Sequence, residues 1–227
     1  MKEKDKTSLM FRETAEGLIQ GLFGVAASDR KDLILSIGYI FQRARSGTFL
    51  NALLKEWERF REKGRIKDDY VNTDQHQECL QEMLDFLDRD SPDSLRFRML
   101  KAIFLGAATE IQSTRDSVLP QQYMSICRNL SSGEALVLQA TYAIFERGGG
   151  SSSIHAQDWL KDISKESGLE SSELVEIHER KLIEKNLITD RKYGDRSGVK
   201  LGSFYRLTPL GLAICKFITT FEKQNDG

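Results

Sequence analysis

The most informative stretch of this sequence is residues 173–218, which read ELVEIHERKLIEKNLITDRKYGDRSGVKLGSFYRLTPLGLAICKFI. The spacing of its apolar residues predicts a helix up to residue 186, a short strand, a basic loop over 189–200 and a second strand over 202–207. A last helix is expected to begin at Thr208-Pro209, because threonine is a favoured cap and proline a favoured first helical residue. Helix, two-stranded ribbon and helix in this order are typical of the C-terminal half of a winged helix-turn-helix.

Residues before this stretch predict the remaining helices of the motif. Ser131 and Glu134 have the spacing of a capping box, in which each side chain bonds a backbone N–H at a helix start. The helix that this box starts covers residues 135–146. A further helix is expected to end at Gly168, and a tight turn joins it to the helix over 173–186 as a helix-turn-helix pair. The run GGGSSS at 148–153 is either a flexible linker between domains or a mobile loop inside the motif. We prefer the loop, because the helix before it is the first that the motif requires.

The first 128 residues predict a separate helical domain, because strand patterns are absent from them. The clearest helix spans residues 48–63 and carries an apolar stripe with spacings of three and four, formed by Phe49, Leu53, Trp57 and Phe60. The run Asp90-Ser91-Pro92-Asp93 predicts a new helix with a serine cap and proline as its first residue. The predicted fold class is therefore mainly α. An N-terminal helical bundle (1–128) is followed by a winged helix-turn-helix with a small two- or three-stranded ribbon (129–227).

The composition describes a globular protein rather than a general nucleic-acid binder. Of the 227 residues, 40% are hydrophobic and 30% charged, which is enough apolar material for a sizeable core. A formal net charge of −1 means that a nucleic-acid role needs a local basic patch. Cys79, Cys127 and Cys215 are odd in number and imply no disulfide framework. A signal-peptide pattern and a bilayer-spanning apolar run are both missing, so we expect a cytoplasmic protein without a membrane partner.

A local basic patch is expected where the motif would contact DNA. The loop supplies basic side chains for phosphates, and the helix before it adds more. The candidate DNA-binding residues are Arg180, Lys181, Lys185, Arg191, Lys192, Arg196 and Lys200. Glu170, Glu173 and Glu176 stand near the start of the same helix and would face phosphates. Acids there also complement the helix dipole, and the basic residues could equally be a solvated face and loop, so both interpretations stay open.

The sequence predicts neither a catalytic nor a metal site. His76 and Cys79, three apart on a helix, could supply half a zinc site, but a second pair is missing and Cys79 lies on an apolar stripe. Motifs that place a nucleophile beside a base, or a lysine after the glycine run, are also missing. We therefore expect a protein that is not an enzyme and takes no cofactor. His178 either contacts a phosphate or packs at the helix pair.

From about residue 130 onward the chain resembles the winged-helix domains of MarR- and PadR-like bacterial proteins. The resemblance is carried by LIEKNLI at 182–188 and by YRLTPLG at 205–211. It implies binding of double-stranded DNA and a homodimer formed through helices outside the loop, for which residues 13–41 are the expected surface. The chain also resembles the abortive-infection Abi-alpha group, in which a helix start like SGEA at 132–135 precedes the same kind of ending.

Two functions from different classes follow from these patterns. The first is a DNA-associated bacterial winged-helix protein of the transcriptional-regulator type, with the seven basic residues on DNA. The alternative is a non-catalytic protein-interaction adaptor in a phage-defence or stress system. In the adaptor, the acidic start of the helix at 173–186 would meet a basic protein partner.

Overall fold

The computed structural model describes residues 37, 39–40, 43–66, 69–89, 92–109, 119–148, 156–189 and 206–225. The chain forms two compact units, Met1–Arg128 and Asn129–Gly227, and each is considered by itself below. All the regular elements that the structure describes are helices, which confirms the mainly α prediction. In this part of the chain, none of the helices combines the length and the apolar character needed to cross a membrane.

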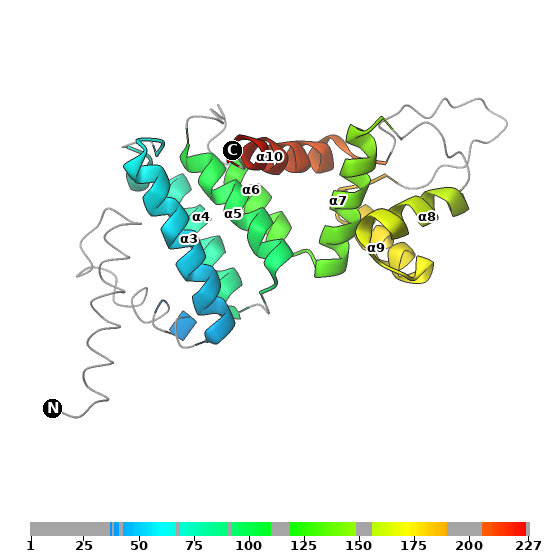
Figure 1. Cartoon of the computed structure of the whole chain (residues 1–227), viewed down its shortest axis with the longest axis horizontal. Coiled ribbons are helices and arrows are strands. Elements are labelled where there is room, and N and C mark those ends of the chain that lie inside the picture. The colour runs from blue at the N-terminus through cyan, green and yellow to red at the C-terminus, as the bar shows by residue number, and fades with distance from the viewer. Residues whose placement is uncertain are drawn as a thin grey trace. The chain divides into compact units, whose positions relative to one another are not determined.

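Helices of the N-terminal unit form a bundle (Figure 1). The elements with described bounds are α3 (Ala44–Glu62), the short 3-10 helix η2 (Tyr70–Asn72), α4 (Asp74–Arg89), α5 (Ser94–Ala108) and α6 (Leu119–Arg128). The predicted apolar stripe faces the interior: Leu53, Trp57 and Phe60 are fully buried, and Phe49 stacks on Phe97 with ring centroids 4.5 Å apart. Spacing by three and four therefore identified the buried face of α3 correctly.

Arg128 joins two helices of this bundle through ion pairs. Its guanidinium lies 2.8 Å from Glu82 and 3.3 Å from Asp85, which both belong to α4. The start of α5 corrects one prediction, because the N-cap is Asp93 and not the serine two positions earlier. A carboxylate oxygen of Asp93 accepts the backbone N–H groups of Leu95 and Arg96, each at 3.0 Å. A single aspartate can satisfy two free N–H groups of a first turn in this way.

The described residues of the C-terminal unit form four helices. They are α7 (Ser132–Glu146), α8 (Ala156–Ser167), α9 (Ser172–Glu184) and α10 (Pro209–Asn225). Helix α7 packs against the other three and lies between the α8–α9 pair and α10 in Figure 1. The capping box of Ser131 and Glu134 is present at its start, as predicted. Between α8 and α9 the chain turns at Gly168, whose φ of 70° lies in the left-handed region that glycine tolerates.

The winged-helix prediction is wrong. The described residues of the C-terminal unit contain no strand or sheet, but one isolated antiparallel bridge between Ile188 and Leu207. A ribbon needs a ladder of successive pairs on both strands. The sequence that would extend this ladder, residues 190–205, is rich in glycine and charged residues, which are depleted in strands.

Some predictions fall on residues outside those that the structure describes. They include the glycine–serine run beyond residue 148 and most of the expected dimer surface at 13–41. The four basic residues of the loop, Arg191, Lys192, Arg196 and Lys200, also lie outside the described residues.

Candidate functional site

Helix α9 presents one buried and one exposed face in the C-terminal unit. Val175, Glu179 and Leu182 are buried at spacings of four and three, which is one helical stripe. The helix begins at a cap where the Leu174 N–H donates to Ser171 Oγ at 3.3 Å. It ends just before Asn186, whose φ of 56° turns the chain out of the helix. The position of α9 is thus fixed by its sequence at both ends.

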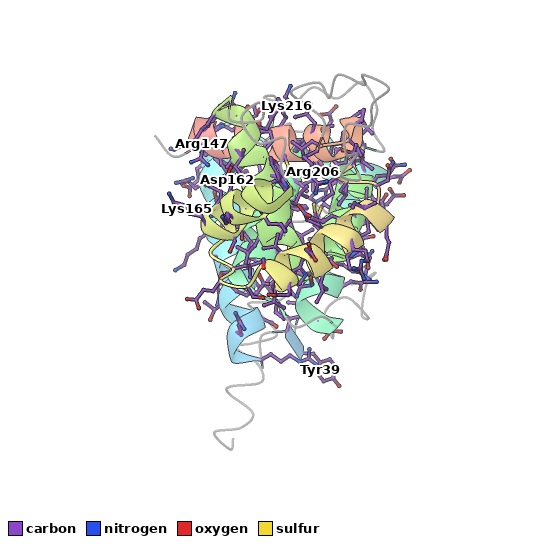
Figure 2. All side chains as sticks on the ribbon, turned by 90° about the vertical axis from the view of Figure 1, so that its right-hand side faces the viewer. Tyr39, Arg147, Asp162, Lys165, Arg206 and Lys216 are labelled. Carbon is purple, nitrogen blue, oxygen red and sulfur yellow. The ribbon has the colours of Figure 1, made fainter. Side chains whose placement is uncertain are left out.

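A buried ion pair on the inner stripe anchors α9. The Glu179 carboxylate accepts Trp159 Nε1 of α8 at 2.9 Å and lies 2.6 Å from Arg206 Nη2. Only 3% of the Glu179 side chain and 4% of the Arg206 side chain are exposed. The Arg206 guanidinium also lies 5.5 Å from the centre of the Trp159 ring. One carboxylate therefore holds α8, α9 and Arg206, three residues before α10, together. Figure 2 labels Arg206, and it also labels Asp162 and Lys165, two exposed residues of α8.

The sequence interpretation did not single out this cluster. Its one local signal is that Glu179 replaces an apolar residue on the stripe of Val175 and Leu182. An acid at such a position needs a buried partner, because an isolated charge in the interior is costly. Which residue would be that partner could not be read from the sequence.

Lys185, a predicted DNA-binding residue, takes part in a second anchor. Its ammonium group lies 2.5 Å from Glu134 Oε2 and donates to the Asn129 carbonyl at 3.0 Å. The Glu134 side chain is 7% exposed, and its Oε2 also accepts the Ser131 backbone N–H at 2.9 Å. Lys185 thus joins the end of α9 to the capping box of α7.

His178 packs on the start of α7. The ring lies over Gly133 so closely that a Cβ at this position would meet His178 Nε2 at 2.1 Å. With the His178 ring in this position, only a glycine fits at 133. The structure thus places His178 against the start of α7 and not within the predicted helix pair, and a phosphate contact stays a prediction.

The outer face of α9 combines two apolar side chains with charges of both signs. Leu174 and Ile177 are 45% and 50% exposed, and among the described residues Tyr39 is the remaining large apolar side chain with high exposure. We call this face the α9 surface; its members are Glu173, Leu174, Ile177, Arg180, Lys181 and Glu184.

Two local contacts organise charges on the α9 surface. The Ser171 hydroxyl donates to Glu173 at 2.6 Å, and this hydrogen bond is the main cause of a lowered pKa of the Glu173 carboxyl. Glu173 is therefore ionised at neutral pH. Lys181 forms an ion pair with Glu184 at 2.9 Å. Arg180 and Lys181, the other two predicted helix contacts to DNA, are both exposed here.

His76 and Cys79 lie in the core of the N-terminal unit. Trp57, Tyr70 and Phe104 surround the His76 ring at centroid distances of 5.1 to 5.5 Å. Burial raises the pKa of the Cys79 thiol to about 12, so it is not a thiolate at neutral pH. Across the described residues, no group of three or more histidine, cysteine, aspartate and glutamate side chains is arranged to hold a metal ion.

The chain was also compared with known protein families, curated proteins and solved structures. None of these comparisons found a match. A functional interpretation of this protein accordingly depends on the geometry of its own residues, above all the α9 surface.

Proposed function

We propose that the C-terminal unit is a non-catalytic protein-interaction module whose docking surface is the α9 surface. One observation carries the proposal: Leu174 and Ile177 stay about half exposed on a helix whose opposite face is fully packed. Removing the exposed half of each side chain from water would contribute about 1 kcal/mol per residue. Charged residues on both sides of this apolar pair resemble the polar rim of a protein interface.

The anchors of α9 suit it to presenting a rigid surface. Glu179 ties the helix to Trp159 and Arg206, and Lys185 ties its C-terminal end to α7. A preorganised helix loses little conformational freedom on binding, which favours affinity. Apolar residues at spacings of three, as at 174 and 177, are the anchors used when a helix docks with a protein partner.

Site-specific photocrosslinking tests this proposal. A photoreactive phenylalanine analogue at Ile177 is expected to capture one defined protein, identified by mass spectrometry, and Leu174→Ser in the same chain should abolish the adduct. The matched control places the analogue at Lys161, an exposed residue of α8. Identical adducts from both positions, or none from Ile177, would contradict the proposal.

A second candidate function is association with double-stranded DNA. It is favoured by hydrogen bonds between Thr189 and Arg206, the two described residues on either side of the basic stretch in the sequence. The Thr189 N–H donates to the Arg206 carbonyl at 2.8 Å, and Arg206 Nη1 donates to the Thr189 carbonyl at 2.7 Å. Thr189 and Arg206, which flank residues 190–205 in the sequence, are thus held side by side, and exposed Arg180 lies on α9. Glu173 and Glu176 on α9 oppose this function by repelling phosphates.

Fluorescence anisotropy with a mixed-sequence duplex tests this second candidate. Phosphate contacts predict binding at about 50 mM salt that falls steeply by about 200 mM, because bound counterions are released. Reversing the charges of Arg191, Lys192, Arg196 and Lys200 together should remove that binding while the circular dichroism spectrum stays unchanged. Equal binding by the reversed variant would exclude the loop as the contact.

A further inference from the structure

The charges along the α9 surface are ordered so that two copies of this surface, one of them reversed, bring opposite charges together. Glu173 and Arg180 stand seven residues apart, which is close to two helical turns, so both lie on one stripe. Ile177 stands almost midway between them on the same exposed face. An acid, an apolar residue and a base therefore follow one another along α9.

We propose that the α9 surface pairs with the α9 surface of a second copy of this chain, antiparallel, about a two-fold axis at Ile177. This inference rests on the proposed interaction function and names its partner. In this arrangement Ile177 of one copy faces Ile177 of the other. Glu173 of each copy lies against Arg180 of the other, and the stem of Lys181 covers Leu174.

Antiparallel pairing is selected by the charges. A parallel pair in register would place Glu173 against Glu173 and Arg180 against Arg180, and like charges in contact disfavour association. Reversal of one helix turns both contacts into opposite-charge pairs and also opposes the helix dipoles. A two-fold axis gives each favourable contact twice.

The same charges favour a second copy over a foreign partner of one sign. Glu173 and Glu184 carry two negative charges of the α9 surface, and Arg180 and Lys181 carry two positive charges. A strongly basic or strongly acidic segment would be repelled at one end of it. One helix face is smaller than the roughly 800 Å² per partner of a stable interface, so we expect a weak, concentration-dependent dimer.

Disulfide trapping of the full chain tests the position of the axis. Two Ile177→Cys chains would bring their introduced thiols together at the two-fold axis, so mild oxidation should link them into a dimer. The native Cys79, Cys127 and Cys215 are buried and should not interfere. Thr220→Cys, an exposed position of α10, is the control and should link at least tenfold more slowly. Equal linkage of the two variants would overturn the proposal.

Charge exchange tests the antiparallel contacts in sedimentation experiments. Glu173→Arg and Arg180→Glu should each weaken the dimer about tenfold or more, because each change makes two like-charge contacts. The double variant restores both opposite-charge contacts and should recover the original dissociation constant. Lys216→Glu on α10 is a control that should change nothing. Circular dichroism melting curves verify that all variants are folded.

The outcomes separate this inference from the proposed function. A wild-type chain that stays monomeric at all concentrations overturns the inference. A dimer unaffected by the exchanges at 173 and 180 overturns it as well. If photocrosslinking from Ile177 then captures a different protein, the interaction function stands without self-association. If it captures none, both proposals fail.

Discussion

Glu179 Oε1 lies 2.6 Å from Arg206 Nη2 in the interior of the C-terminal unit, where the two side chains are almost completely excluded from solvent. Taking two charges out of water is costly, and the cost is offset because the opposite charges pair and the Glu179 carboxylate also accepts Trp159 Nε1. The pair joins the inner stripe of α9 to Arg206, three residues before the start of α10. It thereby links Arg206, which also bonds Thr189, to the helix that carries the α9 surface.

Removing one member of this pair should destabilise the C-terminal unit severely. Glu179→Leu leaves the Arg206 charge buried and is expected to cost about 3–5 kcal/mol, whereas Glu179→Leu with Arg206→Met should cost less than either single change. Urea unfolding measures the free energy of unfolding of each variant. The two tryptophans lie one in each unit, so Trp57→Phe lets fluorescence report on Trp159 alone. A double variant less stable than both single variants would show that the charges themselves stabilise the unit.

Gly133 and Gly211 each leave room for a close neighbour, but only the neighbour of Gly133 is a side chain that a second mutation can remove. A Cβ at Gly211 would lie 2.1 Å from the Leu187 carbonyl oxygen, which belongs to the backbone and cannot rotate away. A Cβ at Gly133 would instead meet the His178 side chain. Each Gly→Ala change should cost about 1–3 kcal/mol or more. His178→Ala should recover much of the stability that Gly133→Ala loses, as measured by thermal melting. A melting temperature that does not recover would show that His178 is not the group for which Gly133 leaves room.

Local signals predicted the starts of α7 and α10 correctly, because a cap depends on neighbours in sequence. The Thr208 hydroxyl accepts the Gly211 N–H at 3.0 Å, as a cap should, and Pro209 is the first residue of α10. The capping box at Ser131 is likewise present. The pairing of Ile188 with Leu207 depends instead on distant residues. The sequence placed these two residues in a ribbon, but the described residues form one bridge.

The candidate site was harder to predict for the same reason. Arg180, Lys181 and Lys185 look alike in sequence, although the Lys185 ammonium lies 2.5 Å from Glu134, and the other two side chains are exposed. The sequence also did not indicate that Leu174 and Ile177 are exposed, since apolar residues on an amphipathic helix are expected to be buried. Both distinctions depend on how α9 packs against α7 and α8, and the sequence pattern of α9 alone does not contain that information.

Lys185 should therefore matter for stability, unlike its exposed neighbour. Lys185→Ala deprives the buried Glu134 carboxylate of its ammonium partner and is expected to cost about 1–3 kcal/mol. Arg180→Ala, on the α9 surface, should change the free energy of unfolding by less than about 0.5 kcal/mol. Urea unfolding of both variants checks the contrast. Equal stability of the two would mean that the Lys185–Glu134 contact contributes nothing.

The three cysteines should be unreactive in the folded protein. Burial raises the pKa of the Cys79 and Cys215 thiols to about 12 from an ordinary value of 9.0, and Cys127 is buried as well. The thiolate is the reactive form, so at pH 8 an aromatic disulfide reagent should react several orders of magnitude more slowly with native than with unfolded protein. The raised values also predict that stability, fully present below pH 9, falls as pH rises from 9 towards 12, because the unfolded thiols ionise first. Rapid labelling of any native cysteine at pH 8 would show that its helix opens readily, and mass spectrometry would identify which one.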